Sequence, residues 1–349
     1  MKILSIETSC DETAIAILDI SGDPTKPEIT ILGNSLLSQI DIHKEYGGVF
    51  PMLAKREHEK NLPILLQETL KKAGMSLEHP DIDYIAVTAG PGLEPALWTG
   101  ISFAESLGHT WNKRVIPVNH MEGHIFSVLF DIQKQLEFPA LALLVSGGHT
   151  ELVLLDSPIS FRILGKTRDD AVGEAFDKAA RIIGLSYPGG PKISLLAAKH
   201  RAEYPSGTFT FPRPMIHSKD LDFSFSGLKT AVLYKTREFG DLTDEKREEI
   251  ARAFEDAAID TLISKTRAAL EETFPKALIV AGGVSANTYL RSRLEELRNE
   301  FPDITLLLPS KELSTDNAIM IGIAAYVRTI LLPDSSSEGS IQAKGNLSL

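Results

Sequence analysis

The stretch "ILSIETSCDETAIAILDI", residues 3–20, decides how the chain begins to fold. Two apolar, β-prone runs flank the polar turn "CDET", a pattern typical of two neighbouring strands joined by a tight connection. Outward from this pair, the pattern predicts a third strand, a helix, a strand, a second helix and a further strand. Their expected positions are 29–38, 51–73, 83–92, up to about 112, and 115–120.

The second half of the chain repeats this order of elements. "ALALLVSGGHTELVLLD" (140–156) again gives two strands about a tight turn. The remaining elements are expected at 161–167 (strand), 169–184 (helix), 276–287 (strand), 287–300 (helix), 304–309 (strand) and 316–332 (helix). We therefore predict an α/β protein with two duplicated β-β-β-α-β-α lobes around a nucleotide cleft. This order resembles that of the actin-like ATPase fold.

The duplication also predicts the domain boundaries. The first lobe is expected to span 1–135 and the second 136–315, with the final helix (316–332) packing back on the first lobe. The remaining residues, 334–349, are rich in Ser and Gly, and this composition predicts a disordered tail.

Composition bounds the classes of function. The net charge is −11, from 36 Lys and Arg against 47 Asp and Glu. A protein that gripped nucleic acid alone would show a basic excess, so a polyanionic substrate would require partner subunits to supply positive charge. The single cysteine, Cys10, excludes an internal disulfide and favours a reducing compartment. The longest apolar run, 318–326, is too short to span a bilayer. We expect a cytoplasmic protein without membrane contact.

Two polar turns carry residue types that suit a phosphate. The first holds Ser9 and Thr13; the second is "SGGHT", with Ser146, Gly147 and Gly148. Glycines let backbone N–H groups approach an anion, and hydroxyls donate further hydrogen bonds. A glycine-rich turn alone usually only turns the chain, but two at matching positions of a duplicated fold are more informative. The chain has no G-x-x-x-x-G-K-[ST] motif, which excludes a P-loop.

The stretch "VAGGVSAN" (280–287) resembles the adenosine-binding motif of the actin-like fold. Its glycine pair would let a flat base lie on the backbone, and Asn287 could reach the ribose or the base. Gly190 in "YPGGP" could pack closely on a ligand. Asp177 lies on the helix after the second polar turn, where it is either a ligand of ribose hydroxyls or an exposed helix residue.

His120 and His124 in "NHMEGH" lie four residues apart, so on a helix they share one face and could hold one ion. Zinc proteases use H-E-x-x-H, but here Glu122 stands two positions after His120, about 200° round the helix. This geometry disfavours proteolysis. Asp316, at the start of the last helix, could supply a third ligand, and two imidazoles with one carboxylate suit Fe(II) or Zn(II). The alternatives are a chance histidine pair and an N-cap role for Asp316.

Eleven motifs in one order carry a resemblance to a family over almost the whole of residues 1–332. They are "ILSIETSCDETA", "GGVFPMLAKREH", "TAGPGLEPAL", "NHMEGH", "LLVSGGHTEL", "DDAVGEAFDKAA", "YPGGP", "FPRPM", "DFSFSGLKTA", "VAGGVSAN" and "STDNAIMIG". In these motifs the chain resembles the catalytic subunits of bacterial tRNA N6-adenosine threonylcarbamoyltransferase, a family formerly named for a glycoprotease activity.

The resemblance implies a reaction and a set of residues. The expected reaction transfers a threonylcarbamoyl group from threonylcarbamoyl-adenylate to the exocyclic amine of the adenosine 3′ of the anticodon, in tRNAs that read codons beginning with A. AMP is released. The implied residues are His120, His124 and Asp316 for the metal, Leu144, Val145, Ser146, Gly147, Gly148, Asp177, Gly190 and Asn287 for the adenylate, and Asp11 and Glu12 for positioning the accepting amine.

The resemblance also implies cofactors and partners. The metal is expected to be one Fe²⁺ per subunit, with Zn²⁺ as an alternative in vitro, and an adenine nucleotide (threonylcarbamoyl-adenylate, ATP or ADP) occupies the cleft. Besides tRNA, the expected partners are a paralogous actin-like subunit of the TsaB type and a small P-loop ATPase of the TsaE type.

Two other functions fit the same fold. A small-molecule kinase would use the phosphate turns for ATP but would need Mg²⁺ and a general-base aspartate rather than two histidines. A non-catalytic nucleotide-binding assembly subunit would need neither the histidines nor Asp316. The chain departs from the family pattern at Glu105, Trp98 and Ser314. Glu105 and Trp98 lie on a helix that is expected to face a partner protein, so we expect these two departures to change the affinity for that partner.

Overall fold

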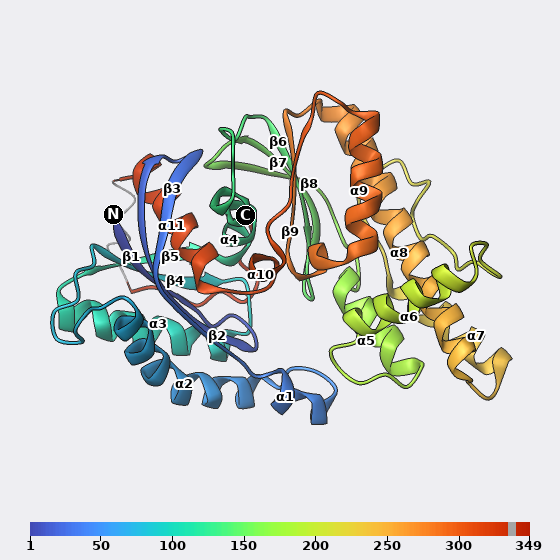
Figure 1. Cartoon of the computed structure of the whole chain (residues 1–349), viewed down its shortest axis with the longest axis horizontal. Coiled ribbons are helices and arrows are strands. Elements are labelled where there is room, and N and C mark those ends of the chain that lie inside the picture. Colours follow the sequence, from blue (N-terminus) through green and yellow to red (C-terminus); the bar gives the residue numbers. More distant parts are fainter. Residues whose placement is uncertain (334–339) are drawn as a thin grey trace. The chain divides into compact units, whose positions relative to one another are not determined.

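The computed structural model describes residues 1–333 and 340–349. The chain forms two compact units, coloured along the sequence in Figure 1. Unit 1 comprises Met1–Leu136 and Pro309–Leu349, and unit 2 comprises Glu137–Leu308. The sequence predicts these divisions after residues 135 and 315, so the chain returns to unit 1 a few residues earlier than expected.

Unit 1 is built on a five-stranded sheet in the order β3-β2-β1-β4-β5. Strand β1 pairs antiparallel with β2 and parallel with β4, and β2 pairs antiparallel with β3. The antiparallel pair is the one that the opening stretch predicts. The strands are β1 (Lys2–Glu7), β2 (Glu12–Asp23), β3 (Lys26–Ser38), β4 (Tyr84–Gly90) and β5 (Arg114–Asn119).

Helices cover both faces of this sheet. Successive side chains of β1 point to opposite faces and almost all of them are buried, so both faces must be covered. Leu4 and Ile6 share a core cluster with the leucines of α2, whereas Ser5 donates to the Ala318 carbonyl of α11. At Gly322 a Cβ would lie 2.6 Å from Leu18, so glycine permits the close approach of α11 to the strands. The helices are α1 (Ile40–His43), α2 (Pro51–Lys72), α3 (Glu94–Trp111), α4 (His120–Phe126), α10 (Lys311–Ser314) and α11 (Ala318–Leu331).

Unit 2 repeats the topology of unit 1. Its sheet has the order β10-β9-β6-β7-β8, in which β6 pairs antiparallel with β7 and parallel with β9. Each strand therefore has a counterpart at the same place in the sheet of unit 1, as the duplicated sequence pattern predicts. The strands are β6 (Ala140–Val145), β7 (Thr150–Ser157), β8 (Ser160–Lys166), β9 (Ala277–Ala281) and β10 (Thr305–Leu307).

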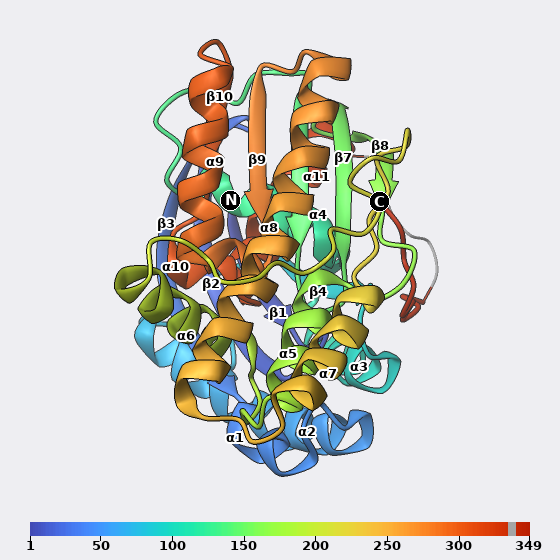
Figure 2. The same ribbon diagram turned by 90° about the vertical axis from the view of Figure 1, so that its right-hand side faces the viewer.

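The helices of unit 2 share one apolar core with its sheet, and Figure 2 views them face on. The long helix α8 contributes Phe254, which meets Phe176 of α5 edge to face at 5.0 Å between ring centroids. The helices are α5 (Val172–Ile182), α6 (Gly190–Glu203), α7 (Ser226–Phe239), α8 (Asp244–Thr273) and α9 (Thr288–Glu300).

Helix α5 starts later than the sequence predicts. Asp169 was expected to open a helix over 169–184, but the helix begins at Val172. Asp169 instead accepts hydrogen bonds from the hydroxyls of Ser224 and Ser226 and from the Phe225 amide. These donors lie more than fifty residues away in sequence, so a tertiary contact takes the place of the cap.

The prediction of a disordered tail over 334–349 is wrong for 340–349, while 334–339 lie outside the described residues. Ile341 is buried in the core cluster of unit 1. Lys344 N–H donates to the Ala89 carbonyl, and Gly92 N–H donates to the Gly345 carbonyl. The tail therefore gains buried apolar area and backbone hydrogen bonds, which composition alone does not show. Glu105, expected to face a partner, accepts the N–H of Ile341.

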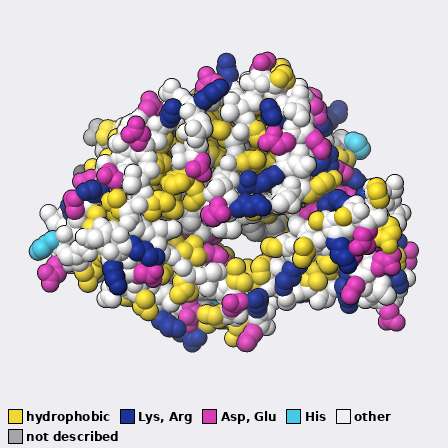
Figure 3. Space-filling view, viewed as in Figure 1, with side chains coloured by type: hydrophobic (Ala, Val, Ile, Leu, Met, Phe, Trp, Pro, Cys, Tyr) yellow, Lys and Arg dark blue, Asp and Glu magenta, His cyan; other side chains and the backbone are white. Residues whose placement is uncertain are grey.

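Within the described residues, the structure contains no helix that is both long and apolar enough to cross a membrane. Lys and Arg side chains are interspersed with Asp and Glu over the face in Figure 3.

Candidate metal centre and nucleotide site

Helix α4 carries the two histidines of unit 1. It follows β5 directly, and Asn119 caps it by accepting the Met121 N–H at 2.8 Å. All seven residues of the helix are buried. His120 and His124 lie on one face, with their ring centroids 4.6 Å apart and their planes nearly perpendicular. The i,i+4 spacing has therefore placed both imidazoles side by side in the protein interior.

Asp316 completes the group from the segment between α10 and α11. Asn317, not Asp316, is the N-cap of α11, because its side chain accepts the Met320 N–H. This leaves the Asp316 carboxylate available to the histidines. Its Oδ1 lies 3.4 Å from Nε2 of His120 and 3.2 Å from Nε2 of His124. One ligand atom from each of the three residues lies within 4.8 Å of the other two.

Glu7, at the end of β1, orients His120. Its Oε2 lies 3.0 Å from Nδ1 of His120 and also accepts the Thr88 hydroxyl at 2.7 Å, and Oε1 accepts the Ser9 N–H. Burial would lower the pKa of His120, but the Asp316 and Glu7 carboxylates outweigh it and raise that pKa well above its usual range. Glu7 thus holds Nδ1–H, and a metal ion would take the place of the Nε2 proton, as carboxylates behind ligand histidines commonly arrange. Sequence reasoning missed Glu7, because nothing in its local pattern differs from an ordinary strand residue.

The chemistry of this donor set fits a divalent cation. Neither ring nitrogen of His124 has a hydrogen-bond partner among the described residues, although Nε2 approaches Asp316. Burial lowers the pKa of His124, so its imidazole is neutral at pH 7. Burial would raise the pKa of Asp316, but the two histidines outweigh it and hold that pKa well below its usual range. Buried nitrogens without partners beside an ionised carboxylate match a two-histidine, one-carboxylate metal site.

Glu122 takes no part in this group. It is buried and its Oε1 accepts from Nη1 of Arg328 on α11 at 2.7 Å. Arg328 thus pairs with the Glu122 carboxylate away from the histidines. The spacing within "HMEGH" predicts this separation from His120. The arrangement gives no support to a protease reading.

The first polar turn places Asp11 between β1 and β2 and Glu12 at the first residue of β2. Asp11 is buried, and its Oδ2 has no hydrogen-bond partner among the described residues. Burial raises the pKa of Glu12 to about 10, and the charges of Asp11 and Asp316 add to the effect. At neutral pH Glu12 is therefore a neutral carboxylic acid, which can donate a hydrogen bond but cannot act as a base.

The second polar turn lies between β6 and β7 in unit 2. Leu144 and Val145 are fully buried strand residues, so only their backbone could meet a ligand. Ser146 accepts the N–H groups of Gly148 and His149 through its hydroxyl. Apart from their chain neighbours, no atom of the described residues lies within 4 Å of a Cβ built on Gly147 or Gly148, so open space borders both glycines. The turn has the room that an approaching anion needs.

The N-terminus of α5 packs against this turn, which the sequence did not reveal. Val172 N–H donates to the Thr150 hydroxyl at 2.8 Å, and Gly173 N–H donates to the Ser146 carbonyl at 3.2 Å. A Cβ on Gly173 would lie 2.6 Å from that carbonyl oxygen, so only glycine allows the approach. The positive end of a helix thus lies beside the glycine turn, an arrangement that favours anions.

Asp177 and Gly190 are brought together. Oδ1 of Asp177 accepts the N–H of Gly189 at 2.7 Å and that of Gly190 at 3.3 Å. The carboxylate therefore shapes the turn that opens α6. Asp177 is half-buried, so it is not the exposed helix residue that the sequence left open as the alternative to a ligand of ribose hydroxyls.

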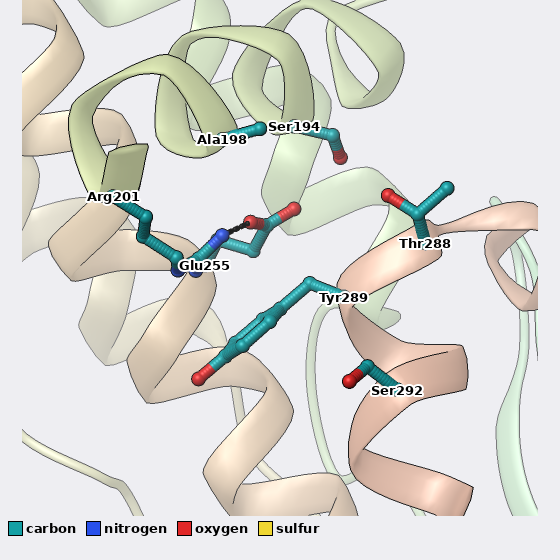
Figure 4. Close-up of a pocket in the computed structure, with 7 residues that line it drawn as sticks. All are labelled: Ser194, Ala198, Arg201, Glu255, Thr288, Tyr289 and Ser292. Atoms are coloured by element: carbon teal, nitrogen blue, oxygen red, sulfur yellow. Dashed lines mark hydrogen bonds and ion pairs between the residues drawn. The ribbon is translucent and has the colours of Figure 1, made fainter. Parts of the chain in front are cut away.

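Asn287 organises a pocket rather than pointing freely into it. Its Oδ1 caps α9 through the Leu290 N–H, and its Nδ2 donates to Ser194 and Glu255, both at 2.7 Å. The pocket next to it has a volume of about 280 Å³ (Figure 4). Its lining comprises Ser194, Ala198, Arg201, Glu255, Thr288, Tyr289 and Ser292.

Arg201 and Tyr289 give the pocket a flat, polar wall. The Arg201 guanidinium lies 3.5 Å from the Tyr289 ring centroid and donates to Glu255 at 2.6 Å, the contact dashed in Figure 4. None of the seven lining residues was predicted. Only two of them had a sequence signal that could have found them: Ser194 lies about one helical turn after Gly190, and Thr288 directly follows Asn287.

The two five-stranded sheets of matching strand order define a protein with the actin-like ATPase fold, and unit 1 adds a two-histidine, one-carboxylate group. The chain belongs to the TsaD family, tRNA N6-adenosine threonylcarbamoyltransferase, whose family model matches residues 30–323. The family's name describes an acyltransferase that modifies tRNA.

Solved structures with low identity support the fold alone. Full-length HypF in its phosphate- and nucleotide-bound form is 14% identical, over 98% of this chain and 47% of that one, with a TM-score of 0.59. HypF from T. kodakarensis is 12% identical, over 95% and 47%, with a TM-score of 0.60. The chain thus spans about half the length of the HypF chains that it matches.

Proposed function

We propose that the chain transfers the threonylcarbamoyl group of threonylcarbamoyl-adenylate to the exocyclic amine of the adenosine 3′ of the anticodon, in tRNAs that read codons beginning with A. The observation that carries the proposal is the group of two buried histidines, His120 and His124, with the half-buried Asp316. Neither a small-molecule kinase nor an assembly subunit of this fold requires such a group. Family membership supplies the class of reaction.

Unit 2 is proposed to bind the adenylate. Backbone N–H groups of the Ser146–Gly148 turn, with the N-terminus of α5, would hold the phosphate. Asp177 with Gly190 would border the ribose, and the pocket organised by Asn287 would take the base. The pocket volume of about 280 Å³ is close to the lower end of the range for small-ligand sites.

His120, His124 and Asp316 would hold one metal ion, proposed to be Fe²⁺ with Zn²⁺ as an alternative. When bound, the ion supplies a Lewis acid with open positions for oxygen ligands. Glu7 keeps the ring of His120 in the orientation and tautomer that ligation needs. Burial of α4 excludes bulk water from the two imidazoles.

The transfer itself needs no covalent intermediate on the protein. The amine nitrogen forms a bond to the carbamoyl carbon, the carbon–oxygen bond to the phosphate breaks, and AMP leaves with the electron pair while the amine loses a proton. Such an anhydride is already activated, so orientation and anion stabilisation are the main requirements. Burial, with the neighbouring Asp11 charge, raises the pKa of the Cys10 thiol well above its usual range, which disfavours thiolate attack.

The first polar turn is proposed to position the accepting amine. The Asp11 carboxylate has a buried oxygen without a partner among the described residues, which an amine N–H could satisfy. Glu12, neutral at pH 7, would act as a hydrogen-bond donor rather than as a base.

Two partner proteins are proposed in addition to tRNA: a paralogous actin-like subunit of the TsaB type and a small P-loop ATPase of the TsaE type. The net charge of −11 supports shared tRNA binding, because this chain has no basic excess of its own. A cytoplasmic location is also proposed, because the family modifies tRNA and the single cysteine favours a reducing compartment.

The test supplies purified chain and both partners with synthetic threonylcarbamoyl-adenylate and unmodified tRNA. We expect modified nucleoside and AMP to form in equal amounts without added ATP. Phosphoryl transfer from ATP to a small molecule, with no modified nucleoside, would favour the kinase alternative. Modification by the partners alone would favour the assembly-subunit alternative.

A further inference from the structure

A chain of buried polar side chains lies behind the Ser9–Thr13 turn, outside the metal group. Thr13, Gln39, His43 and His58 are each completely buried, and they come from β2, the residue before α1, α1 and α2. His43 and His58 flank and end the motif "GGVFPMLAKREH", to which neither the metal site nor the nucleotide site gives a role. Four polar side chains with no access to water must satisfy one another.

The partner of His58 fixes its tautomer. Nε2 lies 3.0 Å from the Cys10 carbonyl oxygen, which can only accept, so Nε2 carries a proton. Burial lowers the pKa of His58, so the ring is neutral and Nδ1 is an acceptor. The Thr13 hydroxyl at 2.8 Å therefore donates to Nδ1, and Nε2 of Gln39 at 3.3 Å shares this acceptor. The same Gln39 amide also lies 3.5 Å from the Ala54 carbonyl oxygen, which can only accept and so keeps the amide nitrogen on this side.

The orientation of Gln39 then fixes His43. With the amide nitrogen of Gln39 toward His58, its Oε1 faces Nε2 of His43 at 3.2 Å, so that nitrogen is the donor. Nδ1 of His43 is left as the acceptor of the Phe50 N–H at 3.4 Å. Burial lowers the pKa of His43 as well, which agrees with a neutral ring. Four hydrogen bonds thus run in one direction, from the Phe50 amide to the Cys10 carbonyl.

The far end of this relay is the turn that borders the metal group. Gln39 N–H donates to the Asp11 carbonyl at 2.9 Å, so Gln39 holds the turn through backbone and side chain. Within the turn, Oγ of Ser9 lies 3.3 Å from Nδ1 of His120. Movement of the Cys10 carbonyl would therefore move both the Ser9 hydroxyl and the Asp11 carboxylate, whose Oδ2 has no hydrogen-bond partner among the described residues.

We propose that His58 and Gln39 are positioning residues of the transfer reaction, holding the Ser9–Thr13 turn through a one-way hydrogen-bond relay so that Asp11 is aimed at the substrate. The proposal rests on the proposed transfer activity for its kinetic consequence. The relay itself is a property of unit 1 and is measurable without turnover. Neither residue touches the reacting atoms. We therefore expect their substitution to lower kcat, the rate of transfer in the bound complex, and to leave substrate binding unchanged.

Three substitutions separate the relay from simple packing. In His58→Gln the amide nitrogen takes the place of Nε2 and still donates to Cys10. In His58→Asn the shorter amide reaches only the place of Nδ1, so the donor to Cys10 is lost. Gln39→Glu replaces the donating amide with an acceptor. His109→Asn, at an exposed position of α3, is the matched control.

The variants are assayed with both partners, tRNA and threonylcarbamoyl-adenylate. We expect His58→Asn and Gln39→Glu to lower kcat by about ten- to a hundredfold, with KM for both substrates and metal content unchanged. His58→Gln is expected to stay within about threefold of wild type, because a single preserved hydrogen bond decides the difference. Equal kcat losses in His58→Gln and His58→Asn, or a wild-type kcat in His58→Asn, would overturn the proposal.

A second measurement is independent of activity. In ¹⁵N-histidine-labelled full-length protein, the His58 ring, assigned by its absence in His58→Gln, should show a neutral Nε2–H tautomer with a slowly exchanging proton. A Nδ1–H tautomer or a cationic ring at pH 7 would overturn the relay. An intact relay in a wild-type protein that transfers nothing would instead refute the proposed function, so the two failures are distinguishable.

Discussion

Glu7 decides which nitrogen of His120 is available to a metal. It accepts from His120, Thr88 and Ser9, so a glutamine would set an N–H₂ group against a donor. We expect Glu7→Gln to weaken metal binding by about ten- to a hundredfold, measured by competition with a chelator. Glu59→Gln on the exposed face of α2 is the control. Equal metal affinity in Glu7→Gln and wild type would show that Glu7 has no part in ligation.

His58 predicts a pH dependence of stability. Burial is the main cause that lowers its pKa below 6.5; the Cys10 carbonyl, Glu7 and Asp11 oppose it, and His43 adds to it. Below about pH 6.5 the unfolded chain therefore binds the proton more readily, and the free energy of unfolding falls as the pH falls. We expect His58→Gln to show a shallower decline between pH 6.5 and 5 in chemical denaturation. Identical slopes would mean that His58 is not held neutral.

The histidine pair was predictable because residues four apart share a helix face, and Asp316 because its motif follows in the expected order. Glu7 was not, since 113 residues separate it from His120 and its own strand pattern is ordinary. The relay was hidden for the same reason. Local sequence shows that Gln39 and His58 are polar, but only the fold shows that both are buried.

At the scale of elements, the contact between α5 and the Ser146–Gly148 turn carries the nucleotide proposal. A Cβ at Gly173 would lie 2.6 Å from the Ser146 carbonyl, so Gly173→Ala must push the helix away from the turn. We expect nucleotide affinity to fall about tenfold or more, a cost of about 1.4 kcal/mol or more, with metal content of unit 1 unchanged. Calorimetric titration with an adenine nucleotide measures this.

Gly207→Ala is the control, because its Cβ would meet only ordinary contacts at 3.8 Å. Wild-type nucleotide affinity in Gly173→Ala would place the phosphate elsewhere. The strands and turns that flank this contact follow from apolar periodicity, which the sequence displays directly. The start of α5 does not, because Asp169 is engaged by Ser224, 55 residues away.

At the scale of the whole molecule, the C-terminal residues 340–349 are part of unit 1. Removing them would expose the cluster around Ile341 and leave the Ala89 carbonyl and the Gly92 N–H without their partners. We expect deletion of 340–349 to lower the stability of unit 1 by about 2 kcal/mol or more, the scale of one buried isoleucine. Differential scanning calorimetry measures it, and the transition of unit 2 should not move.

Lys344→Ala is the control, since that residue contributes its backbone N–H rather than its exposed side chain. An unchanged transition on deletion would mean that the tail is only loosely attached. The duplicated topology was predictable from repeated patterns, but the docking of the tail was not. Its Ser- and Gly-rich composition predicts disorder, whereas one apolar residue and a few backbone hydrogen bonds decide the outcome.

The group of His120, His124 and Asp316 is proposed to serve the transfer of a threonylcarbamoyl group. The most direct measurement compares bound metal and modified nucleoside in wild type, His124→Ala and Asp316→Asn, each supplied with threonylcarbamoyl-adenylate, tRNA and both partners. We predict that both variants lose the metal and the modified nucleoside together while their circular dichroism stays that of wild type. Full transfer by a metal-free, folded His124→Ala would contradict the account.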